Sequence, residues 1–138
     1  LLLEIMPELP KKVKLLIAGK EGRSEDNVYY LGKVLEIEKF YALSDLFVLP
    51  TLYDPGALST LEALASGTPV ITSIYDGTSE FIQEELNGFI TNLDKEDLKL
   101  KILKAINTKW DPKICYESIK FLTWDNYVEC LISQLEGL

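Results

Sequence analysis

The chain has 138 residues, which is enough for one domain with a single sizeable core. Hydrophobic residues make up 47% and charged residues 26%, so neither a disordered nor a collagen-like chain is expected. The net charge is −8, from 14 basic and 22 acidic residues, and the basic surface typical of a nucleic-acid binder is missing.

The sequence has no histidine and two cysteines, Cys115 and Cys130. The absence of histidine excludes Ser-His-Asp triads, Cys-His pairs and HExxH zinc sites within these residues. Two cysteines are too few for a zinc site or a disulfide scaffold, which favours a reducing, cytoplasmic location. The longest mostly apolar stretch, residues 42–53, is too short to span a membrane. The opening LLLEIM is typical of the end of an amphipathic helix rather than of a signal peptide, so we expect a fragment truncated at its N-terminus.

Short apolar runs that do not alternate with polar residues are typical of strands covered on both faces. Such runs occupy residues 13–18, 28–31, 46–49, 69–72 and 88–91. Apolar residues at helical spacing predict helices at 36–44, 57–66, 78–86, 94–107, 112–118 and 123–135. Strands that alternate with helices predict an α/β fold, a Rossmann-like parallel sheet with helices on both faces. We expect one domain over residues 1–138, with a C-terminal helix at 123–136.

Several details of these helices can be tested against the structure. Thr78 or Ser79 is the expected N-cap of the third helix and Asp94 that of the fourth. The helix over 57–66 is expected to bury Leu58, Leu61, Leu64 and Ala65. The last helix places Trp124, Tyr127, Val128, Leu131 and Leu135 on one face.

The loop over residues 50–56 (PTLYDPG) follows a predicted strand and leads into a helix. In an open parallel sheet, ligands bind beyond the carboxyl ends of the strands, where helix N-termini attract phosphates. Glu62 falls at the edge of that helix's apolar side, where its carboxylate needs hydrogen-bond donors that sugar or ribose hydroxyls would supply. Alternatively, it is a partly exposed glutamate on an ordinary helix. Gly19, Gly32 and Gly77 each follow a strand and either admit a ligand close to the backbone or form turns.

Several familiar motifs are missing. The sequence lacks GxGxxG and GxxxxGK[ST], which argues against a classical dinucleotide site and excludes a P-loop NTPase. It also lacks Asp-x-Asp, which argues against sugar transfer through a metal held by two aspartates, so no metal site is expected. A receiver domain needs a phosphorylatable aspartate at the end of a strand, whereas Asp45 begins one. A non-catalytic Rossmann-like binding or interaction module is the alternative to an enzyme.

The segment YDPGALSTLEALASGTPVITSIYDGTSEFI resembles the core of the retaining, GT-B-fold glycosyltransferases of the family-4 type, the glycosyl transferases group 1. LLIAGK, VYYLGKV, LSDLFVLPTLYDP and ELNGFIT resemble further segments of that family, in the same order. The resemblance covers about residues 1–107, and the last helix also fits. It implies that the chain is the C-terminal, donor-binding half of a GT-B fold.

The family signature is an acidic residue and a glutamate eight positions later, here Asp54 and Glu62, which the resemblance assigns to the catalytic centre. By position, Glu62 would bind the ribose hydroxyls of the donor and Asp54 its sugar hydroxyls. The loop Gly32-Lys33-Val34 would flank the base. Backbone N–H groups at the helix start would hold the diphosphate, and they belong to Gly56, Ala57, Leu58 and Ser59.

Weaker candidates for donor contact are Gly19, Lys20 and Gly77. Lys20 and Arg23 either compensate for an Arg and a Lys that the family carries on a strand and loop expected before Leu1, or are solvated loop charges. Asp76 stands where the family usually has glycine, and its charge would oppose nearby phosphates. Glu80 either belongs to the family's Gly-Gly-x-x-Glu motif or complements the dipole of the following helix.

The resemblance implies a nucleotide diphosphate sugar donor, transferred without a metal to a glycan or lipid-linked acceptor. Aspartate followed by proline, at 54–55, resembles a variant among lipopolysaccharide-type transferases and points to cell-envelope polysaccharide. The acceptor site and a catalytic histidine are expected on an N-terminal domain of the same protein. We further expect peripheral association of the full-length protein with the inner membrane. The aromatic face of the last helix is expected either to be exposed or to form a homodimer with a second copy.

Overall fold

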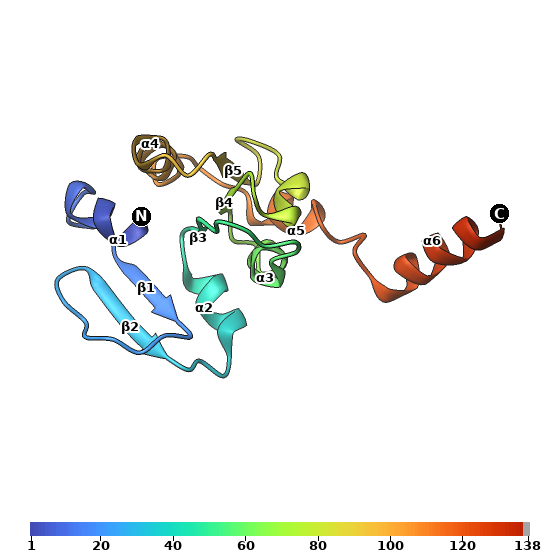
Figure 1. Cartoon of the computed structure of the whole chain (residues 1–138), viewed down its shortest axis with the longest axis horizontal. Coiled ribbons are helices and arrows are strands. Elements are labelled where there is room, and N and C mark those ends of the chain that lie inside the picture. Colours follow the sequence, from blue (N-terminus) through green and yellow to red (C-terminus); the bar gives the residue numbers. More distant parts are fainter. Residues whose placement is uncertain (137–138) are drawn as a thin grey trace.

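The computed structural model describes residues 1–136, and its elements follow the order helix, two strands, alternating helices and strands, then three helices (Figure 1). The strands are β1 (Leu15–Ala18), β2 (Val28–Gly32), β3 (Phe47–Leu49), β4 (Val70–Ser73) and β5 (Gly88–Thr91). The helices are α1 (Leu2–Ile5), α2 (Ile37–Leu43), α3 (Leu58–Ala65), α4 (Lys95–Ala105), α5 (Pro112–Glu117) and α6 (Trp124–Glu136), with 3-10 turns η1 (Met6–Glu8) and η2 (Gly77–Phe81). The predicted α/β architecture is confirmed.

All the strand pairings are parallel, but hydrogen bonds divide the strands into two groups. One group is β1-β2, and the other has the order β3-β4-β5. In Figure 1 the strands follow one another across the molecule as β2, β1, β3, β4 and β5, so β1 faces β3 without pairing to it. The five strands are therefore arranged in one row, and the hydrogen bonding between neighbouring strands is interrupted between β1 and β3.

Two hydrophobic cores lie on opposite faces of these strands. The first joins α1, η1 and α4 to both strand groups, because Leu15 of β1 and Val48 of β3 pack against the same cluster as Phe89 of β5. The second joins α2, α3, η2 and α5, with Leu64 and Val70 fully buried at its centre. Helices thus cover both faces, as expected for a Rossmann-like layering.

The expected helix over 78–86 is wrong. The chain forms only the 3-10 turn η2 there, and its N-cap is Asp76 rather than Thr78 or Ser79. The fully buried side chain of Asn87 ends the turn, since it accepts from the N–H of Gln83 at 2.7 Å and donates to the carbonyl of Phe81 at 2.9 Å. These bonds use backbone groups that a longer helix would need for itself.

The buried face of α3 also differs from the prediction. Leu64 is buried as expected and Leu61 is half-buried, but Ala65 is exposed and Leu58 is 70% exposed. The buried residues beside Leu64 are Ala63 and the polar Thr60. A buried threonine cannot be identified by hydrophobic spacing, because its hydroxyl needs a partner from another element.

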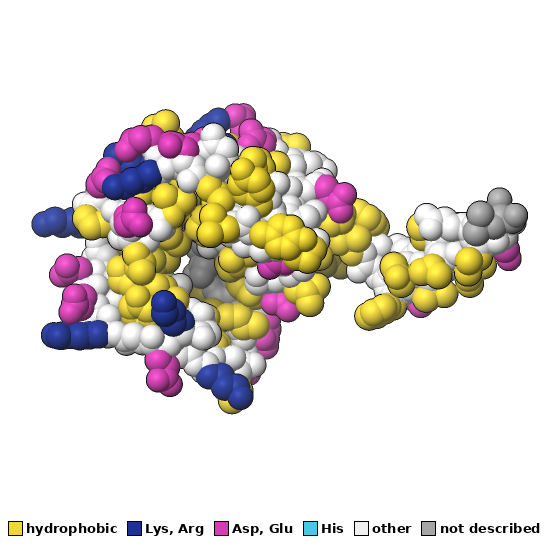
Figure 2. Space-filling model, viewed as in Figure 1, with side chains coloured by type: hydrophobic (Ala, Val, Ile, Leu, Met, Phe, Trp, Pro, Cys, Tyr) yellow, Lys and Arg dark blue, Asp and Glu magenta, His cyan; other side chains and the backbone are white. Residues whose placement is uncertain are grey.

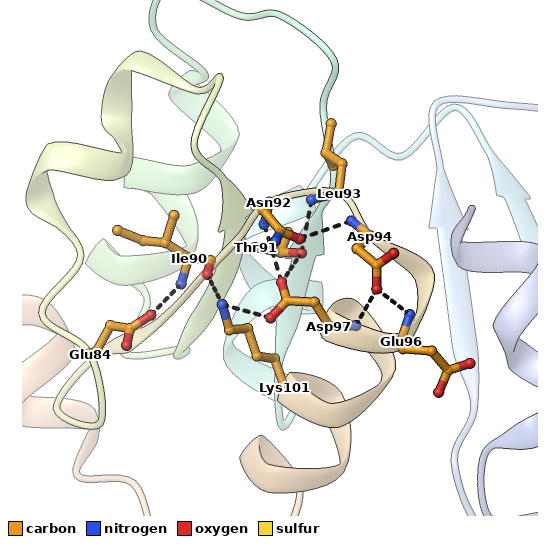
Figure 3. A network of polar contacts seen from close by, with 9 residues as sticks. All are labelled: Glu84, Ile90, Thr91, Asn92, Leu93, Asp94, Glu96, Asp97 and Lys101. Atoms are coloured by element: carbon orange, nitrogen blue, oxygen red, sulfur yellow. Dashed lines mark hydrogen bonds and ion pairs between the residues drawn. The ribbon is translucent and has the colours of Figure 1, made fainter.

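A polar network fixes the corner between β5 and α4 (Figure 3). Asp94 caps α4 as predicted and accepts from the N–H groups of Glu96 and Asp97 at 2.9 and 3.0 Å. Burial would raise the pKa of Asp97, but hydrogen bonds from Thr91, at 2.8 Å, and Asn92, together with the Lys101 ammonium, lower it. This network anchors the last strand to its helix and lies apart from the residues predicted to bind a ligand.

Helix α6 extends away from the rest of the molecule (Figure 1). None of its residues is buried, and Trp124 is 83% exposed. The space-filling view shows a continuous row of apolar side chains along it (Figure 2). Among residues 1–136, no helix is long and apolar enough to cross a membrane.

Candidate functional site

The loop over residues 50–57 is held against the turn that follows β4. The N–H of Asp54 donates to the carbonyl of Tyr75 at 3.1 Å, and the N–H of Gly77 donates to the carbonyl of Asp54 at 2.8 Å. The Ser73 hydroxyl donates to the carbonyl of Thr51 at 2.6 Å. These bonds place the start of α3 beyond the carboxyl end of β3, where the sequence predicts a ligand.

Asp76 is the centre of this arrangement, although it is only 1% exposed. Its carboxylate accepts from the hydroxyls of Thr72, Thr60 and Thr78 at 2.5, 3.0 and 2.7 Å. It also accepts from the backbone N–H groups of Thr78 at 2.9 Å and Ala57 at 3.4 Å. Burial would raise the pKa of Asp76, but the hydrogen bonds outweigh it and lower the pKa.

The carboxylate of Asp76 is therefore turned into the protein rather than toward a ligand. It links β4, η2 and the beginning of α3 through side chains and backbone at once. The sequence analysis treated this residue only as an unfavourable charge. The threonines at 60, 72 and 78 were the signal, since a buried carboxylate needs several donors and only the fold brings these three together.

Gly77 is required by close packing of backbone against backbone. A Cβ at this position would lie 2.1 Å from the carbonyl oxygen of Pro55. The sequence analysis offered two interpretations of this glycine, a ligand contact or a simple turn. Neither accounts for its close packing against Pro55. The glycine allows the 50–57 loop to lie directly on the turn after β4.

Gly19 and Gly32 form a pair at the carboxyl ends of β1 and β2. The N–H of Gly19 donates to the carbonyl of Gly32 at 2.7 Å, and their φ angles are +77° and +60°. Both positions therefore require glycine for its backbone freedom. Lys20 follows directly and is exposed.

Glu62 is exposed on α3 and is oriented by a neighbouring helix. The hydroxyl of Tyr41, on α2, donates to its Oε2 at 3.2 Å. Burial of the phenol, together with the Glu62 carboxylate, raises the pKa of Tyr41 to about 12. Tyr41 thus remains a hydrogen-bond donor at neutral pH and was not identified from the sequence.

A large cavity of about 1640 Å³ opens between the two strand groups. Of the residues predicted to bind a donor, it brings together Gly19, Lys33, Val34, Ser59 and Glu62. The residues that line it do not include Asp54, Gly32 or the three residues from Gly56 to Leu58, nor the weaker candidates Lys20 and Gly77. Glu62 and the loop after β2 therefore share one space, whereas Asp54 lies at the neighbouring loop.

The backbone donors at the start of α3 are partly used by the protein itself. The N–H of Gly56 donates to Oδ1 of Asp54 at 3.0 Å, and the N–H of Ala57 donates to Asp76. Within residues 1–136, the N–H groups of Leu58 and Ser59 have no hydrogen-bond partner. Of the four predicted donors, these two are available to an anion.

The described part of the chain contains no group of three or more His, Cys, Asp or Glu residues placed to hold a metal ion. The expectation that transfer needs no metal remains a prediction. Cys115 is buried, which raises the pKa of its thiol to about 11, and Cys130 is exposed; both are free thiols.

The family model described as glycosyl transferases group 1 matches residues 1–108. The chain belongs to this family. An uncharacterized glycosyltransferase of Methanocaldococcus jannaschii, MJ1607, is 36% identical over 103 residues, which cover 63% of this chain and 26% of that protein. The chain thus spans about a quarter of that relative's length. The predicted resemblance to group 1 glycosyltransferases is confirmed.

Two solved structures share the fold. Sucrose-phosphate synthase from Thermosynechococcus elongatus matches with a TM-score of 0.81 and 23% identity, over 99% of this chain and 41% of that one. Anabaena HepE in complex with UDP matches with a TM-score of 0.78 and 21% identity, over 99% of this chain and 44% of that one. This group 1 domain therefore has the fold of GT-B glycosyltransferases, and both comparison chains are more than twice as long.

Proposed function

We propose that this group 1 domain binds the nucleotide diphosphate sugar donor of a retaining glycosyltransferase. The observation that carries the proposal is the position of Glu62, an exposed carboxylate held by Tyr41 on the wall of the large cavity. The same wall carries Ser59, at the N-terminus of α3, and the cavity extends to Lys33 and Val34. HepE, which shares the fold, binds UDP.

Each part of the donor has a matching group in this arrangement. Glu62 accepts hydrogen bonds from the ribose hydroxyls, with its second oxygen held by Tyr41. The N–H groups of Leu58 and Ser59 and the positive end of α3 bind the diphosphate. The loop over 32–34 flanks the base, and Asp54 contacts the sugar from the neighbouring loop.

Catalysis in this proposal is electrostatic. The nucleotide diphosphate leaves the sugar, and the N-terminus of α3 together with cationic groups stabilises the charge that develops, without a metal. Asp54 and Glu62 orient hydroxyls and do not transfer protons. The acceptor domain and the cationic pair belong to another part of the protein, so residues 1–138 alone bind the donor weakly and transfer no sugar.

Three further parts of the proposal concern the whole protein. The acceptor is a glycan or lipid-linked precursor of cell-envelope polysaccharide, made in the cytoplasm with peripheral contact to the inner membrane. The support is the aspartate-proline pair at 54–55 and the two free cysteines. The exposed apolar face of α6 contacts the acceptor domain or a second copy.

Calorimetric titration with UDP, GDP and ADP tests the donor assignment. Wild type is expected to bind one of them, and Glu62→Ala is expected to weaken that binding at least tenfold, because a charged hydrogen bond contributes about 1.5–3 kcal/mol. Tyr41→Phe is expected to weaken it about threefold to tenfold, through a less ordered carboxylate. Glu38→Ala is the matched control, since Glu38 is an exposed acid on α2 that does not line the cavity, and its loss should leave binding unchanged. Equal binding by wild type and Glu62→Ala, or no binding at all, would favour a non-catalytic module.

A further inference from the structure

Two exposed tyrosines lie at the loops that follow β3 and β4. The backbone of Asp54 forms a parallel bridge with that of Asp76, so Tyr53 and Tyr75 are neighbours one position before this bridge. Side chains of extended backbone point alternately to opposite sides, and the carboxylate of Asp76 points into the protein. Tyr53 and Tyr75 therefore share the outer side, where they are 79% and 50% exposed.

The two tyrosines, which we call the tyrosine platform, belong to a wider apolar surface. Leu52, Leu58 and Ile74 are also exposed in the same segments of the chain. In the space-filling view, apolar side chains gather over the loops that follow β3 and β4 (Figure 2). Exposed apolar side chains that lie together mark a contact surface.

The backbone under the platform is fixed by contacts within the chain. The Ser73 hydroxyl donates to the carbonyl of Thr51, and a Cβ at Gly77 would meet the carbonyl of Pro55, so the two loops pack directly on each other. A tyrosine has only two side-chain torsions to restrict, so little conformational entropy is lost when a partner binds to it. The platform is therefore preorganised for a partner with a flat face.

The groups around the platform indicate an uncharged partner that carries hydroxyls. Within residues 1–136, the phenol hydroxyls of Tyr53 and Tyr75 and the backbone N–H and carbonyl of Tyr53 have no hydrogen-bond partner. No lysine or arginine occurs between residues 40 and 94, so this part of the chain lacks the cations that would attract an anionic lipid surface. A sugar ring fits both observations, because its faces carry C–H groups that pack on aromatic rings and its edge carries hydroxyls.

We propose that the tyrosine platform stacks on a sugar ring of an uncharged acceptor glycan. The inference rests on the proposed function, in which Asp54, the residue after Tyr53, contacts the sugar that is transferred. Neither tyrosine lines the large cavity that contains Glu62, so the platform lies outside the part of the site assigned to the nucleotide. A glycan on the platform is thereby placed beside the transferred sugar. The two tyrosines hold it there and take no part in proton transfer.

The experiment uses the full chain with isotope-labelled tyrosine rings and follows their NMR signals during titration with maltotriose, cellotriose and chitotriose. Each trisaccharide is added to about 20 mM, which is enough to detect a Kd in the millimolar range. The variants are Tyr53→Ala, Tyr75→Ala and Tyr53→Phe. Tyr116→Ala is the matched control, because Tyr116 is 49% exposed and belongs to α5 rather than to either loop. UDP is titrated into the same samples.

At least one trisaccharide is expected to shift the ring signals of Tyr53 and Tyr75. Alanine at either position should weaken its binding about fivefold or more, because the stacking face is lost. Tyr53→Phe keeps that face and should weaken binding by less than about threefold, and Tyr116→Ala should leave it unchanged. Affinity for UDP should stay within about twofold of wild type in every variant, since the platform lies outside the nucleotide part of the site.

Three results would overturn the proposal. The first is the absence of a shift with any of the trisaccharides. The second is an equal loss of UDP and trisaccharide binding in the alanine variants, which would assign the tyrosines to the donor. The third is a shift caused instead by phosphatidylglycerol vesicles or by raised protein concentration, which would mean that a membrane or a second copy covers the platform. Trisaccharide binding by a chain that does not bind UDP would refute the donor assignment and support the platform as a glycan site.

Discussion

Strands β1 (LLIA) and β4 (VITS) have the same length, and β1 is the more apolar of the two, but their environments are opposite to what this composition predicts. Every residue of β4 is buried, whereas β1 alternates between half-buried and exposed residues. The difference lies in their neighbours, since β4 pairs on both edges and β1 on one. Burial of a strand is therefore a property of the sheet around it and not of its own composition.

The loops that follow these strands differ in the same way. After β4, the turn carrying Asp76 and Gly77 is tied to the 50–57 loop by side-chain and backbone hydrogen bonds. After β1, a glycine pair leads to the exposed Lys20. The part of the proposed donor site beside β3 and β4 is thus tied together by hydrogen bonds, and the part next to β1 is exposed.

The largest expected effect comes from replacing Asp76, which is at the centre of the hydrogen bonds between the turn after β4 and the 50–57 loop. Asp76→Ala leaves three buried threonine hydroxyls and two N–H groups short of an acceptor, and each unsatisfied buried group costs about 1–3 kcal/mol. Since some of these hydroxyls can rotate to other partners, we expect the free energy of unfolding to fall by about 3 kcal/mol in urea titrations. Asp54→Ala is the matched control and should cost about 1 kcal/mol or less, because its carboxylate accepts only one N–H at an exposed loop. Equal losses in the two variants would contradict the central role of Asp76.

The next effect concerns the contact between the two loops. Gly77→Ala places a Cβ against the carbonyl of Pro55 and should destabilise the chain by about 1–3 kcal/mol, because backbone on both sides must move apart. Gly56→Ala, in the same loop, has open space around it and should change stability by less than about 1 kcal/mol. Thermal unfolding of the pair measures the difference. A Gly77→Ala variant as stable as Gly56→Ala would show that the loops are not in contact.

A smaller effect is expected on acidification. The pKa of Asp76 is lowered from its usual 3.8 in the folded chain, and that of Asp97 is lowered likewise. A carboxyl group with a lowered folded pKa stabilises the fold fully above its unfolded pKa and loses that contribution as the pH falls through the folded value. The contribution of Asp76 and Asp97 to the free energy of unfolding should therefore be constant above about pH 5 and should decline below about pH 4. Asp76→Asn should flatten this decline in denaturant titrations at pH 2–7, and an unchanged pH profile would contradict the assignment.

The smallest expected effect is at the C-terminus. Ending the chain at Leu122 removes α6, which buries no residue, so the free energy of unfolding should change by less than about 0.5 kcal/mol. Ending it at Asp111 also removes α5 with the buried Cys115 and Ile119, and should destabilise by several times that amount. Circular dichroism during thermal unfolding distinguishes the two truncations. A large loss from the shorter deletion would mean that α6 folds back onto the body.

Local patterns were sufficient for most of the elements. β5 begins and ends where its apolar run predicts, and Asp94 caps α4 because an N-cap aspartate needs only the next three residues. The helix expected over 78–86 failed because the side chains of Asp76 and Asn87, each acting on backbone of the same turn, replaced helical hydrogen bonds. The resemblance located Glu62, but Tyr41, 21 residues away in sequence, could be found only from the fold.

The sequence by itself determined most of the strand and helix segments, the parallel α/β class and the family, because these depend on short-range periodicity and on ordered motifs. The tertiary structure decided which apolar residues are buried, how Asp76 is satisfied and where the sheet is open. Those outcomes depend on contacts between segments that are distant in sequence: Thr60 donates to Asp76, Pro55 packs against Gly77, and β1 faces β3 without hydrogen bonding to it. No local pattern encodes such distances, since the same leucine is buried or exposed according to what the rest of the chain places beside it.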